Sequence, residues 1–333
     1  MDGKAQMDKR PNIIFFGSDA ICLPGLDFLK GEASGQCVLR AVISQPDRPQ
    51  GRGRRLQPNP VAAWAAANEV KLLQPEKPTS ELIDWIREAD IRVGFVMAYG
   101  HFLQKPLRTA PQHGLLNFHG SLLPKYRGAS PVETALAQGE TETGVALMRI
   151  AKEMDAGDVA DVEKVSIGET VTAPELRSQI GEAVVPLLRR NLSAILAGNL
   201  NFQPQDASRA TYCRKLSKID GAIDFTLPAI EIYNRLRAFT PWPGGYFDHK
   251  GKRIKVGSAS VLSDTRVSDE PDGPGVVVKV ESTVCVATGS GFICFHELQL
   301  PGARMLPTAD FLRGYSIMPG DQLVGGAASE LVR

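Results

Sequence analysis

Two polar side chains, Asn117 and His119, end a run of apolar residues that begins at Leu115. Residues two apart on a strand share a face, so both side chains would project together from the end of a strand. An amide and an imidazole placed there can donate hydrogen bonds to the oxyanion formed when a nucleophile attacks a carbonyl group. The same pair could equally satisfy the backbone of the following loop.

A carboxylate near the imidazole would orient the ring and pair with its charged form. Asp155 and Asp158 both lie in the turn-like segment that follows Lys152, and spacing alone does not choose between them. Either could also be an ordinary turn aspartate beside Gly157. The residues therefore indicate chemistry at a carbonyl group and leave the identity of the carboxylate open.

The scaffold for these residues is predicted to be a parallel sheet covered by helices, because β-rich runs alternate with helical patterns through residues 1–200. We predict strands at 12–17, 38–44, 70–73, 91–97, 114–118, 143–150 and 159–165, and helices at 24–30, 58–68, 79–88, 129–137 and 173–197. Open sheets of this kind bind ligands at the carboxyl ends of their strands, where Asn117 and His119 would stand. No GxGxxG or Walker lysine motif occurs, which excludes the common nucleotide-binding sites.

A second domain is predicted beyond a polar linker at residues 201–209, so that the domains are 1–200 and 210–333. The second domain contains a helical pattern at 229–237 and strand patterns at 245–249, 253–261, 274–280, 283–288 and 291–299. Five short strands predict a small β-barrel resembling an oligonucleotide-binding (OB) fold. We interpret Trp242 as a core or hinge anchor rather than as a platform for stacking bases.

Composition excludes several classes of protein. The chain has 333 residues, 43% of them hydrophobic, and a formal net charge of +1, as expected of a globular protein. It contains no apolar run of about 18 residues, so no membrane span is expected. The five cysteines lack CxxC spacing, which argues against a disulfide framework and a zinc site and fits a reducing cytosol. The first ten residues are polar and predict neither a signal peptide nor an organellar leader.

Positive charge is concentrated in one segment, where several arginines are opposed locally only by Asp47; they are Arg40, Arg48, Arg52, Arg54 and Arg55. Interspersed glycines and prolines predict that the segment is mobile. Such a segment can bind phosphates and become ordered on RNA, or it can be a solvated loop.

Three motifs stand out in order along the chain: Asn117-x-His119, Ser121-Leu122-Leu123-Pro124-x-x-Arg127-Gly128 and Asp155-x-Gly157. Taken together, these motifs resemble the folate-dependent formyltransferases. The resemblance implies a Rossmann-like catalytic domain and a catalytic trio of Asn117, His119 and Asp155, which favours Asp155 over Asp158. It also implies a folate pocket formed by Gly100, His101, Phe102, Leu103, Ser121, Leu122, Leu123, Pro124, Lys152 and Glu153, with a cis bond before Pro124.

Other segments are similar to the members of that family that act on methionyl-tRNA: the arginine-rich segment, Lys215-Leu216-Ser217-Lys218, and residues 237–244 and 309–314. This resemblance spans about residues 11–323 and departs from the family at His101-Phe102 and in a short N-terminal extension. It implies formyl transfer from 10-formyltetrahydrofolate to initiator methionyl-tRNA by a monomer in a bacterial cytoplasm, without a metal. The implied tRNA contacts are Arg48, Arg52, Arg54, Arg55, Lys215 and Lys218.

Two alternatives remain at this stage. One is a formyltransferase for a small acceptor, an amino-sugar nucleotide or glycinamide ribonucleotide, whose members lack the arginine-rich segment. The other is an RNA-binding protein built on an inactive formyltransferase scaffold, against which the intact trio argues.

Overall fold

The computed structural model describes residues 9–50, 55–262 and 273–333. Contacts divide the chain into two compact units. The first comprises residues 1–127, 143–165 and 177–210, and the second comprises 128–142, 166–176 and 211–333. The domain limits at residues 200 and 210 stay a prediction.

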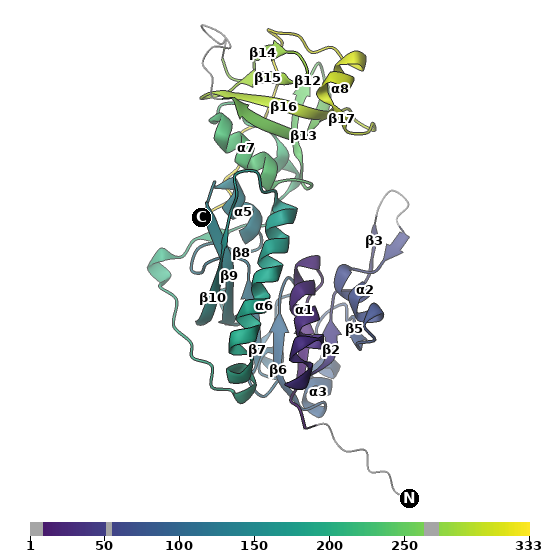
Figure 1. Ribbon diagram of the computed structural model, residues 1–333, viewed down its shortest axis with the longest axis vertical. Coiled ribbons are helices and arrows are strands. Elements are labelled where there is room, and N and C mark those ends of the chain that lie inside the picture. Colours follow the sequence, from purple (N-terminus) through teal and green to yellow (C-terminus); the bar gives the residue numbers. More distant parts are fainter. Residues whose placement is uncertain (1–8, 51–54, 263–272) are drawn as a thin grey trace, which may run out of the picture. The chain divides into compact units, whose positions relative to one another are not determined.

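The first unit is built on a seven-stranded sheet with the strand order β10-β9-β7-β6-β1-β2-β5 (Figure 1). Its strands are β1 (Asn12–Phe16), β2 (Val38–Ile43), β5 (Leu72–Leu73), β6 (Ile91–Val96), β7 (Leu115–His119), β9 (Glu142–Arg149) and β10 (Val159–Ser166). Neighbours from β7 through β5 run parallel, as predicted. Strand β9 runs antiparallel to β7. An antiparallel edge on a parallel sheet is common, and a hydrophobic pattern does not reveal strand direction.

Helices cover both faces of this sheet, which explains why β1 is continuously apolar from Ile13 to Phe16. Ile14 and Phe16 pack on one side with Leu82 and Ile86 of α3 (Ser80–Glu88). On the other side α1 (Leu23–Lys30) and α6 (Ala173–Ala197) lie side by side (Figure 1), and Gly25 of α1 faces Val184 of α6. Helix α6 ends where predicted, before Gly198 with φ +73°. The remaining helices of this unit are α2 (Pro60–Ala67) and α4 (Lys105–Arg108), the latter not predicted.

The second unit contains a curled antiparallel sheet that forms a half-barrel, with the order β12-β13-β16-β15-β14 and β17 beside β16. Its strands are β12 (Gly245–His249), β13 (Lys252–Leu262), β14 (Val277–Val280), β15 (Val284–Ala287), β16 (Phe292–Gln299) and β17 (Leu306–Pro307). The helices are α5 (Pro131–Ala137), α7 (Ala229–Ala238) and α8 (Thr308–Gly314). The rings of Phe247 and Phe295 stack in its core, with their centroids 5.4 Å apart. The predicted α/β sheet with a small OB-like β-domain is confirmed.

Short elements complete the chain: β3 (Arg48–Gln50), β4 (Arg55–Gln57), β8 (Arg127–Gly128), β11 (Tyr212–Cys213), and the 3-10 turns η1 (Ala20–Cys22), η2 (Glu32–Gly35), η3 (Ala207–Arg209) and η4 (Lys218–Gly221). Within the second unit, Tyr212 and Arg333 exchange two backbone hydrogen bonds of 2.9 Å. Among the described residues, no helix has the length and apolarity that crossing a membrane requires.

Two expectations about the second unit are wrong. Cys285 and Cys294 lie opposite each other on β15 and β16 and form a disulfide bond, although cysteine spacing argued against disulfides. Strand register, which spacing does not encode, brings them together. Trp242 is 50% exposed, so its expected position in the core is wrong, while its role as a hinge anchor stays a prediction. The peptide bond from Trp242 to Pro243 is cis, as is the Thr240–Pro241 bond just before it.

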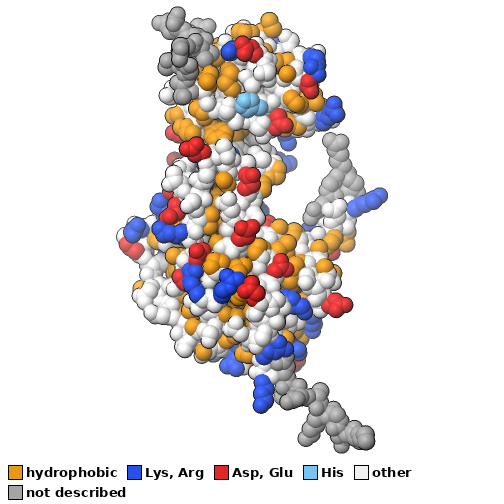
Figure 2. Space-filling view, viewed as in Figure 1, with side chains coloured by type: hydrophobic (Ala, Val, Ile, Leu, Met, Phe, Trp, Pro, Cys, Tyr) orange, Lys and Arg blue, Asp and Glu red, His pale blue; other side chains and the backbone are white. Residues whose placement is uncertain are grey.

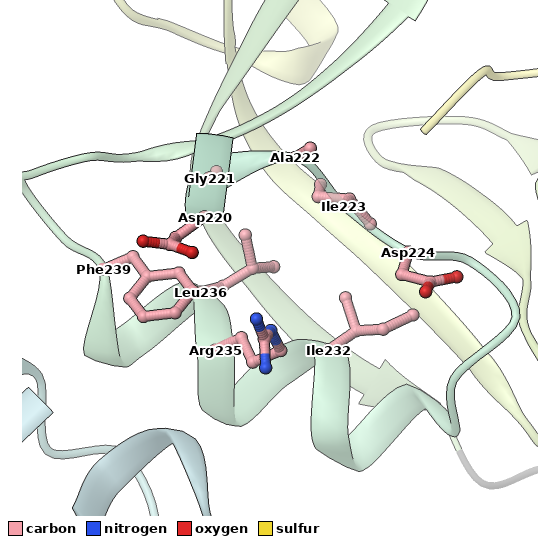
Figure 3. Close-up of a pocket in the computed structure, with 10 residues that line it drawn as sticks. Asp220, Gly221, Ala222, Ile223, Asp224, Ile232, Arg235, Leu236 and Phe239 are labelled. Carbon is pink, nitrogen blue, oxygen red and sulfur yellow. The ribbon is translucent and has the colours of Figure 1, made fainter. Parts of the chain in front are cut away.

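A buried carboxylate organises the segment that enters the second unit. The Asp220 side chain is fully buried and accepts hydrogen bonds from Arg214 (2.9 Å), the Ser217 backbone (2.6 Å) and the Ser329 hydroxyl. Burial opposes ionisation, but these hydrogen bonds outweigh it and hold the pKa of Asp220 below its usual value. Figure 3 shows Asp220 across a narrow pocket from Arg235 of α7. Burial lowers the pKa of Arg235.

We expect Asp220→Asn to lower the free energy of unfolding by about 2 to 3 kcal/mol at pH 7, since it removes charge-assisted hydrogen bonds. The folded-state pKa of Asp220 is depressed, so its contribution is complete above the unfolded-state pKa of about 4 and is lost as the pH falls below that value. Urea unfolding at pH 7 and pH 3.5 should therefore show a difference between variant and parent that shrinks in acid.

The matched control is Asp310→Asn, which breaks an exposed ion pair with Arg313 in the same unit and should change stability by less than about 1 kcal/mol. Equal effects of the two substitutions would show that the Asp220 network does not stabilise this segment.

Candidate active site

His119 is held at the carboxyl end of β7 by the loop that follows it. The His119 side chain is buried, and its Nε2 lies 2.9 Å from the carbonyl oxygen of Tyr126. In this loop, Ser121 Oγ donates to the Lys125 carbonyl (2.6 Å), and Tyr126 has φ +58°. The Leu123–Pro124 bond is cis, as the family resemblance implied. A carbonyl can only accept, so Nε2 carries a proton and donates it.

The structure brings Asp155 to the other nitrogen of the same ring. Asp155 Oδ2 lies 3.6 Å from His119 Nδ1, longer than a direct hydrogen bond but within ion-pair distance. Asp155 has φ +50°, and Gly157 packs so closely that an added Cβ would lie 1.9 Å from the Arg149 carbonyl. The backbone carbonyl of Asp158 accepts from the Arg149 backbone at 2.9 Å. Asp155 thus has a carboxylate oxygen beside the imidazole, and its catalytic role stays a prediction.

Asn117 lies on β7, two residues before His119, and has a strand on each side of it. It pairs with Val96 of β6 and with Met148 of β9. The side chain is half-buried, and the strand period places it on the same face as His119. An amide, an imidazole and a carboxylate are therefore contributed by β7 and by the turn after β9. This set can stabilise an oxyanion and move a proton.

Two of the segments expected to bind folate follow neighbouring parallel strands, β6 and β7, and so lie at the same edge of the sheet. In the first, Leu103 is buried and Phe102 is 68% exposed. Gly100 has φ +81°, and a Cβ there would meet Gln45 Nε2 at 2.5 Å; this Nε2 donates to the Tyr99 carbonyl. In the second, Ser121 is buried while Leu122, Leu123 and Pro124 are half-buried.

The third expected segment, Lys152 and Glu153, is exposed and immediately precedes the turn that carries Asp155. In the first segment, His101 Nε2 is buried, as is the hydroxyl of the preceding Tyr99, and neither has a hydrogen-bond partner in the described part of the chain. Burial raises the pKa of Tyr99 to about 12.

The arginine-rich segment is only partly described. Arg48 and Arg55 lie on β3 and β4, which pair antiparallel, and both are exposed. Arg48 also forms an ion pair of 3.0 Å with Glu76, a partner that local sequence did not suggest. Arg52 and Arg54 lie outside the described residues. On the face shown in Figure 2, basic side chains are interspersed with acidic ones.

Lys215 and Lys218 belong to the second unit and are exposed on either side of buried Leu216. The Asp220 network anchors this stretch through the Ser217 backbone. In the ranges that the structure describes, no three His, Cys, Asp or Glu side chains are grouped as metal ligands would be.

Sequence reasoning missed Gln205, which lies in the stretch interpreted as a linker. Its Nε2 donates to the carbonyls of Asp155 (2.8 Å) and Gly157 (2.7 Å). Its Oε1 accepts from Arg127 Nε (3.0 Å) and from a terminal nitrogen of Arg127 (2.8 Å). Only the match of Arg127 to the family motif could have drawn attention to this group.

Comparison with known proteins identifies the family. The Formyl transferase family model matches residues 12–191, and the Formyl transferase, C-terminal domain, matches 215–316. The methionyl-tRNA formyltransferase of Geobacter sulfurreducens is 38% identical over 313 residues, covering 93% of this chain and 96% of the relative. The methionyl-tRNA formyltransferase of Thermus thermophilus is 41% identical over 315 residues, covering 93% of this chain and 98% of the relative. This chain belongs to the methionyl-tRNA formyltransferase family.

The solved structures agree in fold. A methionyl-tRNA formyltransferase from Clostridium thermocellum has a TM-score of 0.51 at 14% identity, covering 76% of this chain and 94% of that one. The sugar 3N-formyltransferase WlaRD, solved in the presence of dTDP and 5-N-formyl-tetrahydrofolate, has a TM-score of 0.62 at 20% identity, covering 89% and 100%. As a methionyl-tRNA formyltransferase family member, the protein is a one-carbon transferase, which confirms the family and the enzyme class expected from its motifs.

Proposed function

We propose that the protein, as a monomer in a bacterial cytoplasm, transfers the formyl group of 10-formyltetrahydrofolate to the amino group of initiator methionyl-tRNA. The product, N-formylmethionyl-tRNA, serves translation initiation. The observation that carries the proposal is the His119 ring held between the Tyr126 carbonyl and the Asp155 carboxylate, on the strand that bears Asn117. The full-length relatives named for this reaction support it.

In this reaction the methionyl amine forms a bond with the formyl carbon, the bond from that carbon to N10 of the folate breaks, and one proton passes from the amine to N10. The carbonyl oxygen becomes negative in between. The Asn117 amide and the His119 imidazole stabilise that oxyanion. Because Nε2 is committed to the Tyr126 carbonyl, Nδ1 is the nitrogen that can take up or release a proton. Asp155 orients the imidazole ring from the Nδ1 side and helps to relay the proton of the amine.

The folate binds along residues 100–103, Ser121 to Pro124, and Lys152 with Glu153. Support comes from the common edge of β6 and β7 and from the position of Lys152 and Glu153 beside Asp155. The tRNA contacts the arginine-rich segment, through Arg48, Arg52, Arg54 and Arg55, and also Lys215 and Lys218. The donors of this mechanism are side chains, so it needs no metal ion.

The direct test incubates the protein with 10-formyltetrahydrofolate and either initiator or elongator methionyl-tRNA, and measures formylmethionine. We expect rapid formylation of the initiator tRNA and little of the elongator. Formylation of small amines in preference to both would favour a small-acceptor enzyme. Folate binding without any turnover would favour an RNA-binding protein on an inactive scaffold.

Replacing either oxyanion donor should lower kcat strongly. We expect Asn117→Ala and His119→Ala each to reduce kcat on the order of 100- to 1,000-fold, the usual effect of losing one such donor. Single-turnover formylation measures the loss, and circular dichroism checks folding. His296→Ala, which removes an exposed histidine bonded to Ser260, is the control and should keep full activity. Near-normal turnover in either Asn117→Ala or His119→Ala contradicts the assignment.

The arginine-rich segment should act on the RNA and not on the chemical step. For Arg52→Ala we expect a higher KM for methionyl-tRNA. The plot of log(kcat/KM) against log salt should become less steep by about 0.7 to 0.9, the effect of one lost phosphate contact. Formylation of a small methionine ester should be unchanged. Arg87→Ala removes an exposed arginine of α3 and serves as the control. Equal losses with the ester and the tRNA argue against an RNA role.

A further inference from the structure

The amide of Gln205 joins two carbonyls of the turn that carries Asp155. Both amide hydrogens are used, one toward the Asp155 carbonyl at 2.8 Å and the other toward the Gly157 carbonyl at 2.7 Å. Gln205 itself is placed by the backbone of Gln203, which exchanges two hydrogen bonds with Val159 at the start of β10. The turn is thus tied to the segment after α6.

Arg127 determines which way this amide points. Arg127 is 4% exposed, and two of its nitrogens donate to Gln205 Oε1. A guanidinium has donors only, so the amide oxygen must face Arg127 and the amide nitrogen must face the two carbonyls. In the reverse orientation, the amide NH2 of Gln205 would face the donors of Arg127, and the amide oxygen would face the carbonyl oxygens of Asp155 and Gly157.

The turn needs this external support because its own conformation is unfavourable. Asp155 is in the left-handed region at φ +50°, which costs energy for a residue with a Cβ. Gly157 is pressed against the Arg149 carbonyl with no room for a side chain. Such a conformation persists only where surrounding groups hold it.

The same chain of contacts reaches His119 from its other side. His119 bonds to the carbonyl of Tyr126, and the next residue, Arg127, bonds to Gln205. Gln205 bonds to the backbone of Asp155, whose carboxylate faces His119. The contacts form a closed ring. One hydrogen-bonded unit therefore positions both the His119 ring and the Asp155 carboxylate, whose nearest atoms are 3.6 Å apart.

We propose that Arg127 and Gln205 are positioning residues that fix the Asp155 carboxylate against His119. They act through Asp155 and do not touch the reacting atoms. This inference rests on the proposed function, because it assumes that Asp155 works with His119 in formyl transfer.

The sharpest variant is Gln205→Glu, which preserves the shape and an acceptor for Arg127 but sets an oxygen against both carbonyls of the turn. We expect kcat to fall about 10- to 100-fold, the usual effect of displacing a catalytic group by roughly 1 Å. The KM values for folate and methionyl-tRNA should change little. Gln203→Glu, an exposed glutamine two residues earlier, is the matched control and should keep the parent's activity.

A double-mutant cycle separates positioning from a general structural effect. In an Asp155→Asn background, Gln205→Glu should change kcat by less than about 2-fold, because two residues that act through one group are not additive. The pH profile of kcat for Gln205→Glu should also move toward that of Asp155→Asn. An equal fold-loss in both backgrounds overturns the proposal.

Hydrogen exchange gives a readout that does not need activity. The amides of residues 153–158 should exchange faster in Gln205→Glu than in Gln203→Glu, and unchanged exchange would overturn the proposal. If Gln205→Glu does not fold, Arg127→Lys replaces it, since a lysine keeps the charge but lacks the paired donors; we expect a several-fold loss of kcat with the same non-additivity. Full activity of Asp155→Asn would overturn the role of Asp155 in the reaction, and with it this proposal, whereas absence of formylation by the parent protein would overturn the proposed function and leave the exchange result standing.

Discussion

The hydrogen bond from His119 to the carbonyl of Tyr126 is the contact on which the site depends. A buried imidazole needs partners for its polar atoms, and this bond satisfies one nitrogen while it determines which nitrogen faces Asp155. The bond exists because the loop after β7 turns back on itself within seven residues. The sheet supplies a fixed strand end, and the loop supplies the orientation.

Much of the scaffold follows from the sequence because its signals are local. From Ile13 to Phe16, strand β1 is apolar without alternation because helices cover both of its faces, and Gly198 ends α6 as glycine does after a last helical turn. Helix α4 escapes such reasoning because its four residues are too few to show a period, and α8 was not predicted either. The direction of β9 and the Cys285–Cys294 bond depend on strand register, which no local pattern records.

The site divides in the same way. Strand alternation relates Asn117 to His119, and this required nothing beyond neighbouring residues. The choice of Asp155 over Asp158 came from resemblance and is supported by a contact between residues 36 positions apart. Gln205 gave no signal at all, because a glutamine beside Pro204 in a polar stretch is typical of a linker. Its importance comes from two carbonyls about fifty residues earlier in the chain.

The pairing of Tyr212 with Arg333 affects when the second unit can complete its fold during synthesis. In the segment that enters the second unit, the Cys213 carbonyl accepts a hydrogen bond from the Ala129 backbone, which is synthesised earlier, whereas the backbone of Tyr212 pairs with Arg333. On the ribosome, the two hydrogen bonds between Tyr212 and Arg333 can form only after about 120 further residues have been synthesised, which takes several seconds at the usual rate of elongation. The first unit, complete at Ala210, has no such delay. Folding during translation can thus proceed from the catalytic sheet to the half-barrel.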